Sequence, residues 1–156
     1  MKAKDMMIPL LEHLKPDDTL KEAAGILRTA KRDEEKIGVK GLPVLDDKGK
    51  MIGFLSMGDI LKAVFPHYMS LMNLGEFTWD GMVEELAKKA GSKKVADMMT
   101  THVVSVDEDS PLIECVGHMI KNNIKKLPVI GKQGKVVGIL YERDLFFAIT
   151  KAMNGD

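Results

Sequence analysis

Hydrophobic and polar positions follow the same order in both halves of this 156-residue chain. In the second half, β-branched residues at 103–106 predict a short strand, and apolar side chains recur at helical spacing over 112–120. Two more strands are predicted at 126–130 and 136–140, and another helix opens at 142–144. The predicted order is strand, helix, strand, strand, helix.

The first half repeats this order, with its five elements predicted at residues 10–14, 20–29, 42–45, 51–55 and 59–64. End signals also mark the first helix of the second half. Asp109 or Ser110 is expected to be its N-cap, Pro111 its first residue, and Asn122 with Asn123 its end.

An internal repeat explains the shared order. Asp-Met-Met at 5–7 returns at 97–99, an offset of 92 residues. Leu-Pro-Val and the glycine-lysine hairpin return at an offset of 85, with the pairs starting at Leu42 and Leu127 and at Gly49 and Gly134. The first copy therefore holds seven extra residues, and the charged stretch 32–38 is expected to be that solvated loop.

A segment of helical composition separates the two copies. Pro66 is expected to stop the preceding helix, and 67–74 and 79–90 are predicted helical. We therefore divide the chain into a first repeat (1–65), a helical insertion (66–94) and a second repeat (95–153), the two repeats forming one compact module.

The composition limits the function. Lys plus Arg and Asp plus Glu both number 23, so there is no surplus of cations for general nucleic-acid binding. Apolar runs are shorter than the ~20 residues that cross a bilayer, and the N-terminus lacks a signal-peptide core. A cytoplasmic protein that binds neither nucleic acid nor membrane is expected.

Signals for catalysis and metal binding are weak. The four histidines are scattered without HExxH spacing, and neither a Walker loop nor a GxSxG elbow is present. Cys115 lies on the apolar side of a predicted helix and is expected to be buried and inert. The acidic clusters 46–47 and 107–109 fit turns better than a cation cage. We expect no catalytic residue and no metal site.

The duplicated unit, with its Pro-Val before the glycine-lysine hairpin and an aspartate six residues past the second glycine (Asp59 and Asp144), resembles a tandem CBS-domain pair, named after cystathionine β-synthase. The resemblance covers 1–65 and 92–153. It implies an α/β (α+β) fold of two β-α-β-β-α repeats about a pseudo-twofold axis, with the helical insertion between them. It also implies clefts for adenosine-containing ligands and pairing as flat homodimers.

The segment from Phe54 to Asp59 runs from a predicted strand into the first turn of a helix. Free N–H groups and the helix dipole there favour phosphate, and the Ser56 hydroxyl can donate to it. The Asp59 carboxylate can accept both hydroxyls of a ribose, so we expect it to be partly exposed. Ser56 and Asp59 would also suit a ligand-free helix cap. Within the duplicated framework we favour the nucleotide site.

The resemblance implies which residues complete this first site. Ser56, Gly58 and Asp59 should face residues of the other repeat, namely Thr100, His102, Val104, Ile124, Lys125 and Lys126. Phe54, Val104 and Ile124 would bracket the adenine. The two lysines lie where the family often places basic phosphate ligands.

The mirror site departs from the family pattern because Tyr141 replaces the Ser or Thr. Asp144 could still hold a ribose, and Arg143 could supply a phosphate charge. Opposite them should lie Leu10, Val39 and Lys40, together with Glu12, which repels phosphate. We expect one good site and one degraded or differently selective site.

The sequence thus predicts a regulatory module rather than an enzyme, without a catalytic cofactor. It would sense AMP, ADP, ATP or S-adenosylmethionine by conformational change, act as a homodimer, and signal to a separate regulated protein. The alternative is a ligand-free oligomerisation module, whose apolar insertion closes a dimer or packs on its own repeat (Met69, Leu71, Met72, Leu74, Phe77 and Trp79).

Overall fold

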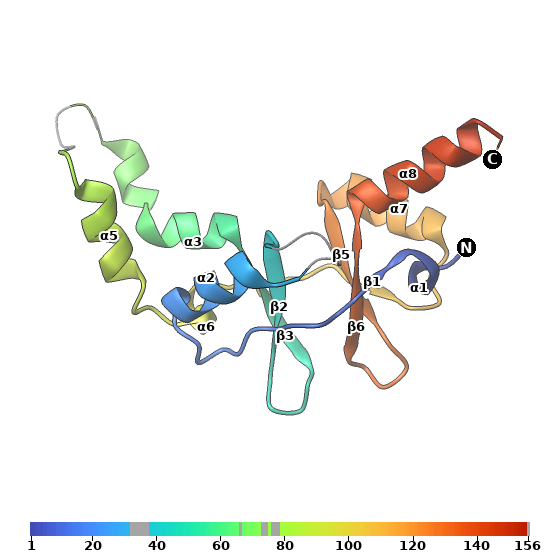
Figure 1. Ribbon diagram of the computed structural model, residues 1–156, viewed down its shortest axis with the longest axis horizontal. Coiled ribbons are helices and arrows are strands. Elements are labelled where there is room, and N and C mark those ends of the chain that lie inside the picture. The colour runs from blue at the N-terminus through green and yellow to red at the C-terminus, as the bar shows by residue number, and fades with distance from the viewer. Residues whose placement is uncertain (32–37, 66, 73–74, 76–78, 156) are drawn as a thin grey trace. The chain divides into compact units, whose positions relative to one another are not determined.

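The computed structural model describes residues 1–31, 38–65, 67–72, 75 and 79–155, and the chain divides into two compact units (Figure 1). Unit 1 consists of Met1–Leu11, Asp47–Met51 and His102–Asp156. Unit 2 consists of Glu12–Asp46 and Ile52–Thr101. The stretch that leads into each copy of the repeat therefore folds with the other copy.

Unit 1 is built on a four-stranded sheet of order β1-β6-β5-β4. β4 runs parallel to β5, whereas β1 and β5 are antiparallel to β6. Its elements are α1 (Ala3–Met6), β1 (Ile8–Pro9), β4 (Val106–Asp107), α7 (Leu112–Asn122), β5 (Lys126–Ile130), β6 (Val136–Tyr141) and α8 (Glu142–Met153).

Unit 2 repeats this plan around the paired strands β2 and β3. Single bridges from Leu14 to Val44, parallel, and from Phe54 to Thr100, antiparallel, replace the outer strands of unit 1. Its elements are α2 (Leu20–Thr29), β2 (Gly41–Leu45), β3 (Met51–Ser56), α3 (Met57–Val64), the 3-10 helix η1 (His67–Leu71), α5 (Met82–Ala90) and α6 (Val95–Met98).

The predicted α/β (α+β) class with two β-α-β-β-α repeats is confirmed, and most elements lie within two residues of their predicted bounds. The first strand of each copy was predicted too long. In the stretch 10–14 only Leu14 forms a bridge, and in the other copy the strand is reduced to Val106–Asp107. Both strands are short because few of the backbone N–H and carbonyl groups in these stretches form hydrogen bonds with a neighbouring strand.

The predicted start of α7 is also wrong, although its end is confirmed. Pro111 is the N-cap, and the helix begins one residue later. The Ser110 hydroxyl instead accepts a hydrogen bond from the Asp107 N–H at 3.1 Å, so it closes a turn and does not cap the helix. Asn123 ends the helix in the left-handed region, with φ of 51°, as asparagine tolerates.

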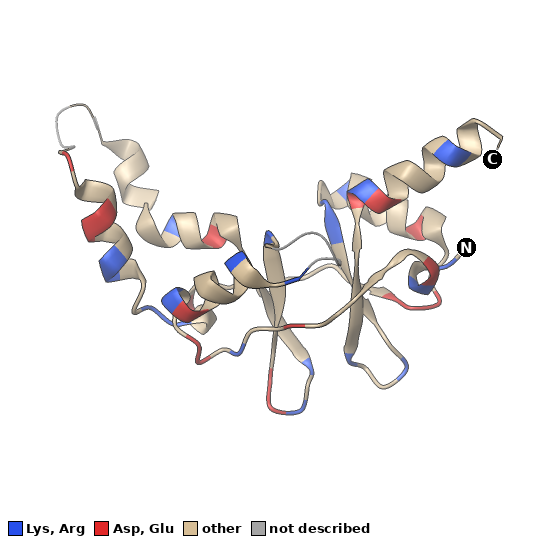
Figure 2. Ribbon diagram, viewed as in Figure 1, with Lys and Arg blue, Asp and Glu red and all other residues tan. Residues whose placement is uncertain are grey.

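The helices α2 and α7 each bury an apolar stripe in the core of their unit. In α2, Thr19 caps the first turn by accepting from the Glu22 N–H, and Leu20, Ala23 and Leu27 are buried at helical spacing. In α7, Cys115 and Met119 join a core with residues of β5, β6 and α8. Figure 2 shows the charged residues spread over helices and loops.

The insertion is helical where the structure describes it, as η1 and α5. Met69 is buried, whereas Leu71 and Trp79 are exposed. Outside the described residues lie Pro66, Leu74 and Phe77, and residues 32–37 of the loop predicted over 32–38. Within the described ranges, no helix combines the length and apolar character needed to cross a bilayer.

The segment Met1–Leu11 in unit 1 and the segment that ends at Thr101 in unit 2 each fold with the other copy of the repeat, and we call them the exchanged segments. They dock by equivalent contacts in the two units. In unit 1, the N–H groups of Ala3 and Lys4 donate to the carbonyls of Ser110 and Glu108, at 2.8 and 3.0 Å. In unit 2, Val95 and Ala96 donate at the same distances, to Asp18 and Pro16. The repeated Asp-Met-Met motif therefore marks two short helices, α1 and α6, that fold in the same way on opposite copies.

Two glycines permit this docking. A Cβ atom on Gly138 of β6 would lie 2.7 Å from Met7 Sδ and 2.8 Å from the Ile8 carbonyl oxygen. A Cβ atom on Gly53 of β3 would lie 2.5 Å from Met99 Sδ and 3.0 Å from the carbonyl oxygen of the next residue. Both positions therefore need glycine because the backbone of the exchanged segment passes directly over the strand.

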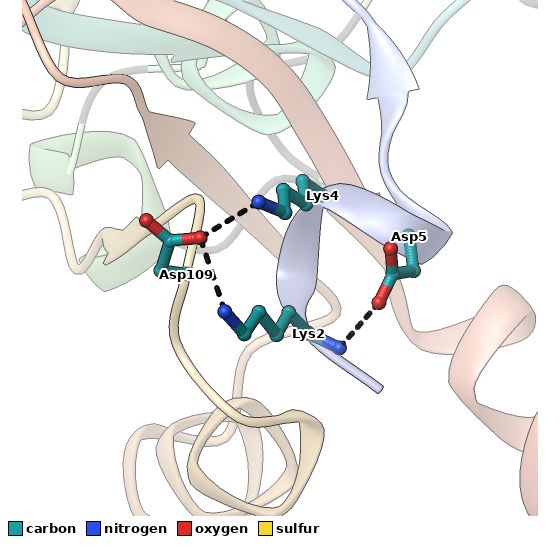
Figure 3. Close-up of polar contacts among 4 residues, drawn as sticks. All are labelled: Lys2, Lys4, Asp5 and Asp109. Atoms are coloured by element: carbon teal, nitrogen blue, oxygen red, sulfur yellow. Dashed lines mark hydrogen bonds and ion pairs between the residues drawn. The ribbon is translucent and has the colours of Figure 1, made fainter.

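Ion pairs also hold α1 in unit 1 (Figure 3). Asp109 Oδ1 lies 2.9 Å from Lys4 Nζ and 3.5 Å from Lys2 Nζ. The hydrogen bond to Lys4 lowers the pKa of Asp109 and raises the pKa of Lys4. Asp5 accepts from the Lys2 N–H at 2.8 Å and so closes the first turn of the helix.

We predict that Gly138→Ala lowers the free energy of unfolding by about 1–3 kcal/mol, because the new methyl group overlaps a backbone oxygen that cannot move independently. Gly117→Ala is the control, since its Cβ would meet no heavy atom within 4 Å in the middle of α7 and should gain up to about 1 kcal/mol. Urea denaturation measures both. Equal effects of the two variants would contradict the close approach.

We also predict that the Asp109 contribution depends on pH. Its pKa is lowered in the folded chain, so the stabilisation is present above the ordinary aspartate value and is lost as the pH falls through the lowered value. The melting temperature of Asp109→Asn should be below that of the wild type near about pH 6 and should converge with it as the pH falls below the lowered pKa of Asp109. Asp17→Asn is the control at the equivalent position, where Lys94 Nζ contacts the backbone oxygen at 3.1 Å. A pH-independent difference for Asp109→Asn would contradict this account.

Candidate functional site

The junction of β3 and α3 is closed by a reciprocal pair of side-chain contacts. Ser56 is the N-cap with extended backbone, and its hydroxyl oxygen accepts from the Asp59 N–H at 3.2 Å. Asp59 Oδ2 accepts in turn from the Ser56 N–H at 2.9 Å and from the Ser56 hydroxyl at 3.1 Å. The helix therefore begins with a capping box, which fixes both side chains at its positive end.

Asp59 is only 8% exposed, so the expectation of a partly exposed carboxylate is wrong. Its Oδ2 atom turns back onto the helix start instead of pointing to solvent. Ser56 and Asp59 therefore do form the helix cap that the sequence also suggested. It is compatible with ligand binding, because the same box holds the carboxylate in one defined position.

The structure brings several expected site residues together within unit 2. Phe54 and Thr100 exchange two backbone hydrogen bonds of 2.9 Å, which places Thr100 beside the strand two residues before Ser56. Gly58 is exposed in the first turn of α3. The Lys40 carbonyl accepts from the Met57 N–H at 2.8 Å. This contact satisfies one of the N–H groups that have no partner within the first turn of the helix.

The other residues expected at this site belong to unit 1. His102 and Lys125 are exposed, whereas Val104 and Ile124 are half-buried against the core of that unit. The Lys125 carbonyl accepts from the Glu142 N–H at 2.8 Å, which matches the contact of Lys40 in unit 2. That these unit 1 residues and Lys126 bind a ligand beside Asp59 stays a prediction.

The equivalent junction of β6 and α8 lacks the box. Tyr141 is the N-cap but makes no side-chain cap hydrogen bond, and Asp144 Oδ2 is buried without a hydrogen-bond partner among the described residues. Arg143 lies over the Phe147 ring at 5.4 Å. Leu10 donates its N–H to Val137 in this unit, whereas Val39 and Lys40 belong to unit 2. The two helix starts therefore differ in chemistry.

Neither metal ligands nor an activated nucleophile stands out in the described part of the chain. No group of three His, Cys, Asp or Glu side chains converges there. Cys115 is fully buried in the core of unit 1, and this burial raises the pKa of its thiol. A raised pKa disfavours the thiolate that a nucleophile requires.

Sequence reasoning missed two features of the site. The first is the docking of Thr100 on Phe54, although the repeated Asp-Met-Met motif and the glycine of each hairpin were its signals. The second is the hydrogen bond from the Met57 N–H to the Lys40 carbonyl at the start of α3. A contact between backbone groups requires no particular residue type, so the sequence carries no signal for it.

Known proteins resemble this chain along most of its length. A family model described as CBS domain matches residues 3–66 and 95–151, more than half of the chain. The protein MJ1426 of Methanocaldococcus jannaschii is 33% identical over 124 residues, which are 71% of this chain and 73% of that protein. Inosine-5'-monophosphate dehydrogenase of the same organism is 27% identical over 92% of this chain, but the match spans only 23% of that enzyme.

Solved structures give the same result. CBSX2, a CBS-pair protein from Arabidopsis thaliana, has a TM-score of 0.70 and 26% identity, and the match covers 98% of this chain and 96% of that one. CBSX2 has also been solved in complex with AMP; that structure has a TM-score of 0.68 and 25% identity, covering 97% and 98% of the two chains.

We predict that Ser56→Ala lowers the free energy of unfolding by about 1 kcal/mol, because it removes the cap of α3 and one donor to the buried Asp59. Ser92→Ala is the control, since that hydroxyl only donates to an exposed helix end and its loss should change stability by less than about 0.5 kcal/mol. Urea denaturation compares them. An equal effect of both changes would show that the box contributes no stability.

Proposed function

Because the chain belongs to the CBS domain family, we propose that it is a regulatory module that binds an adenosine nucleotide at the start of α3. The observation that carries this proposal is the capping box of Ser56 and Asp59, beside which Thr100 is held by Phe54. A serine, a carboxylate and a helix N-terminus are thereby fixed within one unit. The equivalent junction in unit 1 lacks this combination.

The proposed chemistry uses groups that the box already orients. The hydrogen bonds that the Asp59 carboxylate accepts from described residues use Oδ2, so Oδ1 is our proposed acceptor for the two ribose hydroxyls. The Ser56 hydroxyl, which now donates to Oδ2, would turn its proton to a phosphate oxygen. The N–H groups and dipole at this helix start favour the negative charge of that phosphate.

AMP is the first ligand to test, because CBSX2 was solved with AMP and covers almost the same length. ADP, ATP and S-adenosylmethionine share its adenosine and are the further candidates. We propose that Phe54, Val104 and Ile124 contact the adenine, and that His102, Lys125 and Lys126 complete the site. The basic side chains would decide how many phosphates are accepted.

We propose that the Asp144 site is weaker. Tyr141 makes no side-chain cap hydrogen bond at its helix start, and the buried Oδ2 atom of Asp144 has no hydrogen-bond partner within the described part of the chain. The nearby Arg143 guanidinium lies over the Phe147 ring. A ligand there would have to supply the missing hydrogen bonds itself.

We further propose that two copies form a homodimer and that ligand occupancy changes its conformation, which a separate protein then reads. We retain 1–65, 66–94 and 95–153 as repeat, insertion and repeat. One observation favours the alternative of a ligand-free oligomerisation module: Leu71 and Trp79 of the insertion are both exposed.

Thermal unfolding with AMP, ADP, ATP and S-adenosylmethionine tests the nucleotide proposal. A preferred ligand at 100 times its dissociation constant should raise the melting temperature by about 5 °C or more, as mass action requires. Asp59→Asn should remove this shift, because it keeps the size and hydrogen-bonding shape of the cap but loses the charge offered to the ribose.

Asp144→Asn is the matched control, since it makes the same change at the weaker site and should keep the shift. No shift with any of the four ligands would favour the oligomerisation module. An equal loss of the shift in both variants would reject the assignment to Asp59.

A further inference from the structure

Helix α5 of the insertion carries apolar residues on two sides. Met82 and Leu86 are half-buried and Ala90 is buried, at a spacing of four residues, and the helix contacts α3 of the same unit. Val83 and Ala87 have the same spacing on the neighbouring side, but both are exposed. Val83 is 68% exposed. One stripe therefore anchors the helix in unit 2, and the other faces outward.

A second contact holds the insertion on α3. Lys93, which follows the end of α5, donates from Nζ to the Ala63 carbonyl at 3.4 Å. Ala63 lies in the last turn of α3 and is itself buried. The exposed stripe of Val83 and Ala87 therefore belongs to a helix whose position is fixed by its own unit, as a binding surface requires.

Charge is divided along the same helix. Glu84 and Glu85 lie in its first turn and Lys88 and Lys89 in its last turn, and all four are exposed. Figure 2 shows acidic residues toward the start of α5 and basic residues toward its end. None of the four forms an ion pair with another described residue. The helix dipole favours this order in any helix, but it does not explain an apolar stripe left open beside the charges.

We infer that α5 binds the α5 helix of a second copy of the chain, the two helices running antiparallel about a two-fold axis. Val83 of one copy then meets Ala87 of the other, and the symmetry forms the same contact a second time. The larger side chain faces the smaller one at both places. The residues of this contact all belong to unit 2. The inference rests on the homodimer proposed above and names the surface that forms it.

The charges select the antiparallel direction. Antiparallel pairing places the first turn of each helix beside the last turn of the other, so Glu84 and Glu85 lie near Lys88 and Lys89 of the second copy. Parallel pairing would bring acidic turns together and basic turns together. Opposite charges fix the register of an interface, and like charges suppress the wrong pairing.

Trp79 adds a further complementary pair. It lies two residues before Gly81, the N-cap of α5, and is 54% exposed. In the antiparallel arrangement it lies beside the end of the second helix, where Lys88 and Lys89 are found. An indole ring attracts an ammonium group placed over its face. Each copy thus carries the aromatic ring at one end of α5 and the cations at the other.

Disulfide cross-linking tests the contact. Val83→Cys and Ala87→Cys place thiols opposite each other, so an equimolar mixture of the two single variants should give linked dimers on mild oxidation. Either variant alone should give far fewer, because identical positions are displaced by about one helical turn and a disulfide needs Cα atoms within about 7 Å.

Two controls accompany this experiment. The wild-type chain should give no links, because its Cys115 is buried. Val83→Cys mixed with Ile113→Cys should give none either, since Ile113 is 78% exposed but lies on α7 of unit 1. Links in this second mixture as frequent as those between positions 83 and 87 would reduce the result to random collision and would overturn the inference.

Two other outcomes would also overturn it. Linking within a single variant in preference to the mixture would mean parallel helices. An absence of links in every sample would mean that α5 does not pair, whatever oligomeric state sedimentation then reports. These samples contain no nucleotide, so failure here is distinct from loss of the AMP shift.

Exchange of the charges gives an independent measurement. Glu84→Lys with Glu85→Lys makes the exposed charges of α5 all basic, and Lys88→Glu with Lys89→Glu makes them all acidic. Each double variant alone should have a dissociation constant raised several-fold, because like charges then meet along the whole contact. An equimolar mixture should associate more tightly than either variant alone, since a basic helix then faces an acidic one. A mixture no tighter than its components in sedimentation would contradict the pairing.

Discussion

The close passage of an exchanged backbone over a glycine is the constraint on which this structure depends. Gly53 and Gly138 each lie under the first residues of the other repeat, and a methyl group at either position would overlap that segment. Without this approach, Phe54 could not exchange its two backbone hydrogen bonds with Thr100, and Leu10 could not donate to Val137. Neither repeat is therefore complete without residues from outside its own sequence.

This exchange also prepares the candidate site. It holds Thr100 against the end of β3, immediately before the chain turns into α3. The turn itself is fixed by Ser56 and Asp59, which satisfy each other's backbone N–H groups. In unit 1 the same exchange places Ile8 beside Ile139, but Tyr141 has replaced the capping hydroxyl. One scaffold thus carries two helix starts of different chemistry, and this difference supports the proposed difference in affinity.

Local patterns predicted most of the fold because the signals lie within a few residues. The helix at Leu20–Thr29 has an apolar face at regular spacing, and the strand at Lys126–Ile130 is an apolar run ended by a turn. The first strands failed because their length is set by partners far away in sequence. Ser110 failed as a helix cap because its hydroxyl serves a turn, a choice that the residue type leaves open. The Ser56 to Asp59 spacing did predict the junction of the site, but the expected partial exposure of Asp59 was wrong, because burial depends on packing around the helix start.

A nuclear magnetic resonance titration of the ¹⁵N-labelled chain with AMP tests the central claim most directly, since it reports both whether the nucleotide binds and where. The account predicts saturable shifts of the backbone amides, largest from Ser56 to Asp59 and at Thr100, with smaller changes from Tyr141 to Asp144. A spectrum unaltered by AMP, or one whose largest changes fall at the start of α8, would contradict it.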